Sequence, residues 1–136
     1  MNSIVKNILA VVAGVIVGSI VNMGLINISG SIIPPPPGVD VSDMESLKAS
    51  MHLFEPKNFI FPFLAHALGT LAGAYVCALI AAGNKMRFAI AIGIFFLLGG
   101  VTNAYLLPAP LWFIILDITM AYFPMAMLGG YLASKK

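Results

Sequence analysis

The sequence predicts an all-α integral membrane protein: a bundle of four transmembrane helices, with a short amphipathic surface helix in the first loop. Hydrophobic residues fill 60% of the 136 positions and charged residues only 9%, whereas soluble proteins are about half apolar and about a quarter charged. Four apolar stretches are each long enough to cross the bilayer, which takes about 20 helical residues. These spans and their connections use nearly the whole length, so we expect a single transmembrane domain over residues 1–136.

The first predicted span covers residues 4–33, an apolar stretch interrupted mainly by Lys6 and three asparagines. It is longer than the apolar core of a cleaved signal peptide, which has about 7 to 15 residues, and it shows no Ala-x-Ala-like cleavage site. We therefore expect this segment to stay attached as a helix.

A predicted outer loop over residues 34–57 follows, and it opens with four consecutive prolines. Because proline cannot continue a helix, the chain is expected to leave the membrane there in an extended conformation. Ser42 and Glu45 have the spacing of a capping box, and apolar residues recur every three or four positions after them. This pattern predicts the amphipathic helix, lying on the membrane surface or over the helix ends and stopping before Pro56.

The other three predicted spans cover residues 58–82, 88–107 and 110–132. Asn58 is expected to cap the first of them, and Pro62 lies in its first turns, where a missing N–H is tolerated. Gly83 and Asn84 predict a turn, and residues 108–110 are too few for anything but a tight hairpin. The spans should therefore alternate in direction.

The basic residues predict the orientation of the bundle. Lysine and arginine near the spans collect on the cytoplasmic side of membrane proteins. If the amino terminus is cytoplasmic, the basic residues that fall inside are Lys6, Lys85, Arg87, Lys135 and Lys136. We therefore expect a multi-pass protein of the bacterial inner membrane with both termini cytoplasmic and the loop 34–57 outside.

Several short motifs together carry a family resemblance. They are Pro-Pro-Pro-Pro-Gly-Val-Asp at 34–40, Gly99-Gly100-x-x-Asn103, Pro108-Ala109-Pro110-Leu111-Trp112-Phe113 and Leu128-Gly129-Gly130-Tyr131. In these motifs and their order, the chain resembles a widespread group of small uncharacterised four-span bacterial membrane proteins. The resemblance implies the four-span architecture but no activity, and it supplies no catalytic or binding residues.

Gly18-Ser19-x-x-Asn22 matches Gly99-Gly100-x-x-Asn103, and Gly73-Ala74-Tyr75 matches Gly129-Gly130-Tyr131. These matches are consistent with a duplicated two-helix unit, or with chance similarity between glycine-rich helices.

Small residues recur at four-residue spacing in the predicted spans. Such stripes let transmembrane helices approach closely, either within one subunit or between copies of a chain. The stripe residues that we expect at helix contacts are Gly14, Gly18, Ala65, Gly69, Gly73, Gly100 and Gly130.

Asp117 is the only acidic residue within a predicted span. A carboxylate in hydrocarbon is costly, by about 3 kcal/mol on insertion scales, and therefore needs a partner. His66, Asn103 and Asn27 fall at similar depths on the other three spans, so the four side chains could converge on one polar cluster. Such a cluster would either lock the bundle by hydrogen bonds or form a proton- or cation-responsive site. A third alternative is that Asp117 lies shallower and faces interfacial water.

Pro124 lies in the middle of the last predicted span, on the same face as Asp117. Its missing N–H removes the backbone hydrogen bond to Met120, so the helix is expected to kink.

Other kinds of site have no recognisable pattern in the chain. It shows no phosphate-binding glycine-rich loop, no Cys/His metal spacing and no serine nucleophile paired with histidine. The basic face that nucleic-acid binding requires is also missing. We therefore expect no enzyme, no metal, no cofactor and no nucleic-acid partner.

Our first hypothesis for function is a structural or accessory membrane protein, acting as a homo-oligomer or as a subunit of a larger complex in the lipid bilayer. The alternative is a small oligomeric transporter or channel with a responsive site around Asp117 and His66. A membrane enzyme using these two side chains as an acid/base pair ranks third, because no nucleophile accompanies them.

Overall fold

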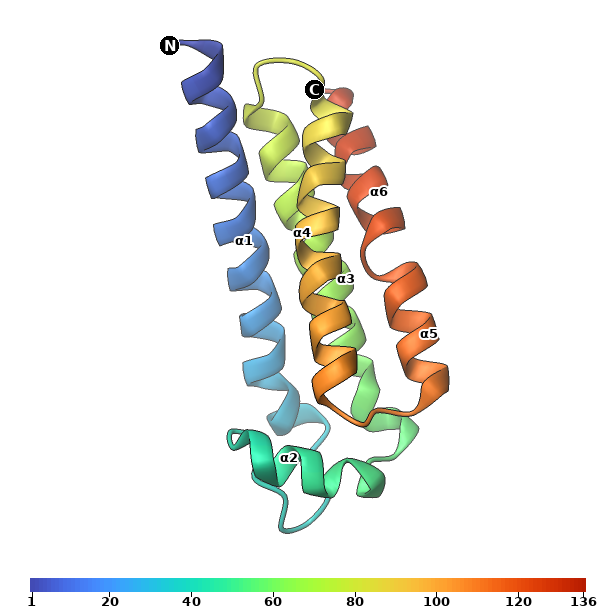
Figure 1. Ribbon diagram of the computed structural model, residues 1–136. Coiled ribbons are helices and arrows are strands. Elements are labelled where there is room, and N and C mark those ends of the chain that lie inside the picture. Colours follow the sequence, from blue (N-terminus) through green and yellow to red (C-terminus); the bar gives the residue numbers. More distant parts are fainter.

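The computed structural model describes residues 1–136 as an all-helical bundle without strands (Figure 1). The long helices are α1 (Ser3–Ile32), α3 (Ile60–Ile80) and α4 (Lys85–Leu106), and the fourth crossing consists of α5 (Leu111–Met120) and α6 (Phe123–Ser134). When residues 56–80 are counted as one helix and residues 111–134 as another, four helices are long and apolar enough to cross a membrane. The structure thus confirms the helical bundle and its four candidate spans.

Successive crossings run in opposite directions. Figure 1 shows both termini at one end of the bundle, together with the turn between α3 and α4; we call this the termini end. Within that turn, Gly83 and Asn84 adopt the positive φ angles that let the chain reverse. The other end carries α2 (Met44–Ser50) and the hairpin between α4 and α5, and we call it the α2 end.

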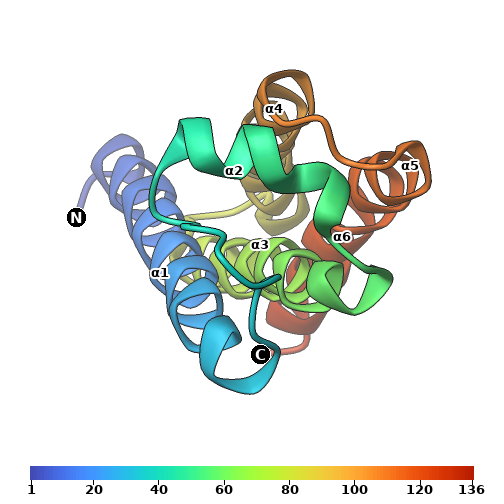
Figure 2. The ribbon, with the colours of Figure 1, turned by 90° about the horizontal axis from the view of Figure 1, so that it is seen from below.

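α3 lies in the centre of the bundle. Seen along the bundle axis in Figure 2, α3 is surrounded by the other long helices, and it packs against α1, α4 and α6. α6 also packs against α4, whereas α1 and α4 have little contact with each other. A gap between α1 and α4, with α3 behind it, follows from this arrangement.

Glycines allow these helices to pack closely. A Cβ atom added to Gly73 would lie 2.6 Å from the Gly14 carbonyl oxygen, and one added to Gly69 would lie 2.9 Å from that of Gly18. Real Cβ atoms do not approach so closely, so only glycine permits this contact between α1 and α3.

The expected packing residues are all buried within the chain, in line with ordinary packing inside one subunit: Gly14, Gly18, Ala65, Gly69, Gly73, Gly100 and Gly130.

The fourth crossing is broken rather than merely kinked. α5 ends at Met120 and α6 begins at Phe123. Pro124 is in the first turn of α6, and it has no N–H to bond the Met120 carbonyl. The break buries the side chain of Tyr122, which occupies the space that Gly100 of α4 leaves open.

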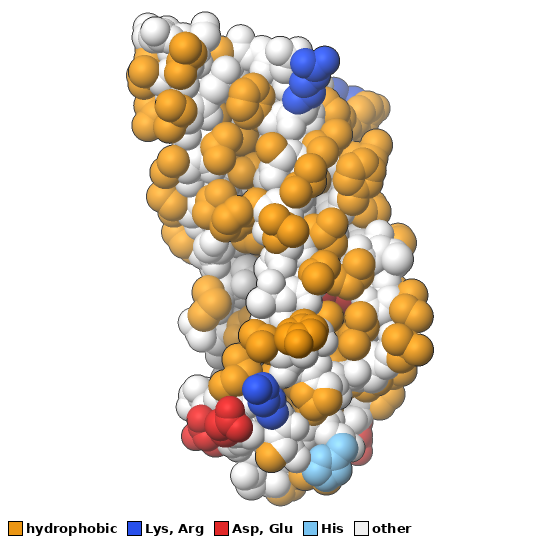
Figure 3. All heavy atoms as spheres, in the orientation of Figure 1, with side chains coloured by type: hydrophobic (Ala, Val, Ile, Leu, Met, Phe, Trp, Pro, Cys, Tyr) orange, Lys and Arg blue, Asp and Glu red, His pale blue; other side chains and the backbone are white.

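The surface helix covers the α2 end of the bundle. α2 continues into a 3₁₀ turn (Met51–Leu53), and a second turn (Pro56–Phe59) leads into α3. Met51 packs with Phe59 and with Phe113 of α5 in a small buried cluster, so the amphipathic segment lies over the helix ends. Figure 3 shows apolar side chains along the length of the bundle, with charged side chains mainly towards its two ends.

Two expected caps are wrong in detail. Ser42 and Glu45 form no capping box, because Asp43 is the N-cap of α2 and its carboxylate accepts a hydrogen bond from the Ser46 N–H at 3.3 Å. Asn58 does not cap α3, because it belongs to the preceding 3₁₀ turn. Its amide nitrogen instead donates to the Pro34 carbonyl oxygen at 3.1 Å and ties the proline-rich segment to this turn.

Candidate functional site

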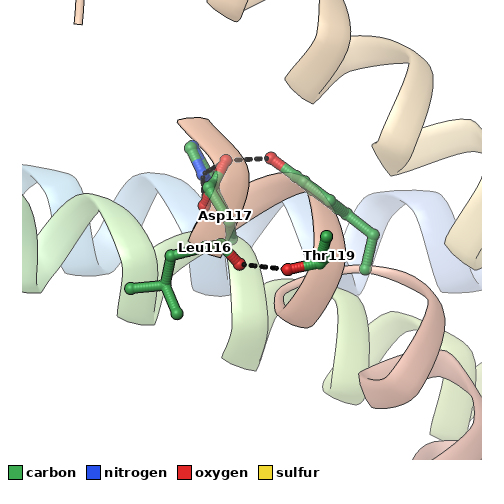
Figure 4. A network of polar contacts seen from close by, with 5 residues as sticks. Leu116, Asp117 and Thr119 are labelled. Atoms are coloured by element: carbon green, nitrogen blue, oxygen red, sulfur yellow. Dashed lines mark hydrogen bonds and ion pairs between the residues drawn. The ribbon is translucent and has the colours of Figure 1, made fainter. Parts of the chain in front are cut away.

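Asp117 of α5 is buried against α3 and the break between α5 and α6. Its carboxylate accepts hydrogen bonds from His66 of α3, whose Nδ1 lies 2.8 Å from Oδ1 and 3.0 Å from Oδ2. It also accepts one from the hydroxyl of Tyr122, at 3.1 Å, in the break between α5 and α6 (Figure 4). His66 and Asp117 each lie six residues from the start of their helices, about 9 Å from the α2 end. The two side chains therefore lie at the same depth in the bundle, and they also face each other.

These contacts fix the orientation of the His66 ring. With the carboxylate as the acceptor, Nδ1 carries the proton of that hydrogen bond. The Tyr122 ring stacks on the imidazole with their centroids 5.7 Å apart and an angle of 27° between the planes. Nε2 is therefore the ring nitrogen left without a hydrogen-bond partner in the protein.

A cavity of about 340 Å³ adjoins this ring. Its polar side chains are Asn22 of α1, His66 and Thr70 of α3, Thr102 and Asn103 of α4, and Tyr122; we call it the polar cavity. It occupies the gap between α1 and α4, and Figure 3 shows the surface hollowed between these two helices in the half nearer α2. Gly69, Gly99 and Gly100 line it as well and have no side chains to fill it.

Two polar atoms in the wall of the polar cavity are buried without a partner: Oδ1 of Asn22 and Oγ1 of Thr70. Threonines in helices often bond a carbonyl oxygen of the preceding turn. Thr102 and Thr119 do so, at 2.8 and 2.6 Å, but Thr70 does not. An unpaired buried hydroxyl costs about 1–3 kcal/mol, which a molecule inside the cavity could offset.

The four polar residues expected to converge do so only in part. His66 and Asp117 meet directly. Asn103 lines the cavity but makes no hydrogen bond with Asp117. Asn27 is exposed and lies outside the cavity, because it is five residues beyond Asn22 and five residues rotate a helix by about 140°.

Sequence reasoning missed Tyr122, Thr70 and Asn22 as site residues. Pro124 signalled the local break but not the direction of the Tyr122 side chain, which depends on the space beside Gly100. The motif match offered a signal for Asn22, because Asn22 and Asn103 are its paired asparagines and both reach the polar cavity. Thr70 shares its face of α3 with His66 and Gly73, which a helical projection shows.

The polar cavity has no fixed charge in its wall. It is lined by no lysine, arginine or carboxylate, and no three His, Cys, Asp or Glu side chains are placed to hold a metal ion. Comparisons with protein-family models, with curated proteins and with solved structures found no match for the chain. Hypotheses about function therefore depend on the geometry of this site.

Proposed function

We propose that this protein is a multi-pass membrane protein that binds a small polar group inside the bilayer, in the polar cavity beside His66. The four apolar helices support membrane insertion. The basic residues at the termini end favour a cytoplasmic location for both termini. The α2 end, and with it the polar cavity, would then lie in the outer half of a bacterial inner membrane.

The unpartnered hydroxyl of Thr70 is the observation that carries this proposal. Thr70 is only 1% exposed, and its Oγ1 has no hydrogen bond within the protein. It is about 15 Å from the α2 end, where hydrocarbon cannot supply a partner. A polar molecule in the cavity would satisfy this hydroxyl, Oδ1 of Asn22 and Nε2 of His66 together.

Asp117 and Tyr122 act as positioning residues in this proposal. The carboxylate and the stacked phenol ring hold the imidazole so that Nε2 is the nitrogen available to the cavity. The imidazole accepts a hydrogen bond at Nε2 when it is neutral and donates one when it is protonated.

The interior favours a binding site over an open channel. Beyond Thr70, towards the termini end, apolar side chains fill the centre of the bundle, among them Ala74, Cys77 and Ala78 of α3 and Ile92 of α4. At the same level, Gly73 of α3 and Gly14 of α1 bring the backbones of these two helices into direct contact. Transport by this chain would thus require a conformational change or an assembly of several copies.

An accessory role is the second candidate, and the exposed face of α1 favours it. Ile4, Ile8, Val12, Ile16 and Ile20 recur every four residues and are all exposed. This stripe could contact a larger membrane protein, whereas the small-residue stripes are used within the chain. Native mass measurement in mild detergent tests this role, because an accessory subunit copurifies with a second protein.

Accessibility of position 70 tests the polar cavity. In the Thr70→Cys variant, a neutral, water-soluble methanethiosulfonate reagent should modify the new thiol in membrane vesicles. Cys77, the only native cysteine, is buried on the same helix and is the internal control. Mass spectrometry of peptides identifies the modified position, and denatured protein should react at both. If the thiol introduced at position 70 reacts no faster than Cys77 in the folded protein, the proposed binding site is wrong.

A further inference from the structure

The wall of the polar cavity restricts the charge of its occupant. An anion would find no lysine or arginine there. A metal ion would find no carboxylate, because Asp117 is engaged by His66 and Tyr122 and does not line the cavity. Amides, hydroxyls and one imidazole remain, and these groups suit an uncharged molecule that forms hydrogen bonds.

The unpartnered atoms also restrict the chemistry of the occupant. Nε2 of a neutral His66 accepts hydrogen bonds, and so does Oδ1 of Asn22. The occupant must therefore carry donors. Thr70 can both donate and accept, so a hydroxyl group, which does the same, is the complementary partner. At about 30 Å³ per water molecule, the cavity has room for roughly ten waters and thus for a glycerol-sized headgroup.

The position of the cavity indicates that the occupant comes from the membrane. The cavity faces the gap between α1 and α4, two helices with little contact. At this level both helices also expose apolar side chains outside the cavity lining, among them Ile20 and Met23 on α1 and Leu98 and Val101 on α4, so lipid chains surround this part of the bundle. A molecule that enters through such surroundings needs an apolar part to lie among the lipid chains. Nearer the termini, Ile8, Val12 and Phe88 line a second, shallow apolar groove between the same two helices, separate from the polar cavity.

We propose that the polar cavity receives the uncharged, hydroxyl-bearing headgroup of a lipid from the leaflet at the α2 end, which enters between α1 and α4. This inference rests on the proposed binding function and names its ligand class. His66, Asn22 and Thr70 contact the headgroup, while Asp117 and Tyr122 position the imidazole.

Diacylglycerol is the simplest probe, because it is uncharged and its one hydroxyl can bond Thr70 and one of the two acceptors. The protein is placed in nanodiscs of phosphatidylcholine, whose headgroup has no hydroxyl, with a few per cent of diacylglycerol or of triacylglycerol. Native mass spectrometry should detect bound diacylglycerol, and the unfolding temperature should rise with its concentration. Triacylglycerol, which lacks the hydroxyl, should do neither. Equal binding of the two lipids would overturn the inference.

A matched pair of variants separates cavity binding from general lipid effects. Thr70→Val keeps the shape of the side chain but removes the hydroxyl, and it should weaken diacylglycerol binding by about fivefold to tenfold. Thr70→Ser restores the hydroxyl and should bind like the native protein. Thr119→Val is the control, because Thr119 is exposed and its hydroxyl bonds its own helix. Equal losses in Thr70→Val and Thr119→Val would reject the assigned contact.

Other occupants give different results. If free glycerol displaces diacylglycerol at equal concentration, the site takes a soluble polyol and the lipid assignment is wrong. If the protein forms a dimer that excludes both lipids, a second copy fills the gap and the lipid assignment is again wrong. If the thiol introduced at position 70 is accessible to the polar reagent but no lipid binds, the proposed binding function stands and only the lipid assignment fails.

Discussion

Replacing Asp117 with leucine removes the acceptor shared by His66 and Tyr122. Asp117 is 4% exposed, and its carboxylate accepts both hydrogen bonds within 3.1 Å. Leucine is apolar and of similar size, so the change tests the hydrogen bonds more than the packing. Asparagine is the matched comparison, because its carbonyl oxygen still accepts one of the two bonds.

The expected loss follows from the burial of the two donors. Tyr122 is 2% exposed, so its hydroxyl would be left unpaired in the interior at a cost of about 1–3 kcal/mol. His66 borders the polar cavity, where water can replace the lost acceptor, and adds about 1 kcal/mol or less. Removing a buried carboxylate offsets part of this cost. We expect Asp117→Leu to lower the free energy of unfolding by about 2 kcal/mol and Asp117→Asn by about 1 kcal/mol or less.

Reversible unfolding in mixed micelles, followed by circular dichroism, measures these differences. A double-mutant cycle with Tyr122→Phe isolates the buried hydroxyl, because phenylalanine keeps the ring beside Gly100 and has no donor. In the Tyr122→Phe background, the effect of Asp117→Leu should shrink by about 1 kcal/mol or more. Equal losses for leucine and asparagine, or strict additivity in the cycle, would show that these hydrogen bonds do not stabilise the bundle.

Three further predictions concern packing, acid titration and topology. Gly69→Leu should destabilise the protein by at least about 1–3 kcal/mol, because even the Cβ atom would lie 2.9 Å from the Gly18 carbonyl oxygen. Gly24→Leu is the control and should have little effect in the same unfolding assay, because a Cβ atom added there has no neighbour within 4 Å. The Ser42 hydroxyl and N–H donate to Asp40 and lower its pKa below 3.8. These hydrogen bonds therefore stabilise the fold above pH 3.8, and the stabilisation is lost as the pH falls through the lowered pKa. Ser42→Ala should raise the pKa of Asp40 towards 3.8 in an NMR titration, and an unchanged value would contradict the assigned cause. Reporter fusions should place the carboxyl terminus in the cytoplasm and the loop 34–57 outside, and a periplasmic reporter active at the carboxyl terminus would reverse the orientation.

Much of the polar site follows from depth along the helices. Asp117 needed a partner in an apolar span, and His66 was the titratable side chain at the same depth, so their pairing could be expected from residue counts. The depth of a residue did not determine the direction in which its side chain points. Asn27 accordingly lies outside the polar site, and Asn103 reaches the cavity but not Asp117. Tyr122 could not be foreseen, because its inward position depends on a helix break and on the space beside Gly100.

The sequence alone determined the four apolar helical crossings, their turns and the small-residue faces that pack together. These properties depend on hydropathy, proline and glycine, which act locally or at a fixed helical spacing. The tertiary structure decided which helices touch: α3 became the centre, and α1 and α4 were left apart. The polar cavity exists because of that gap, and its unpartnered Thr70 hydroxyl becomes significant only there. Helix pairing depends on the combined shape of several helix surfaces, and no single segment of the sequence encodes that shape.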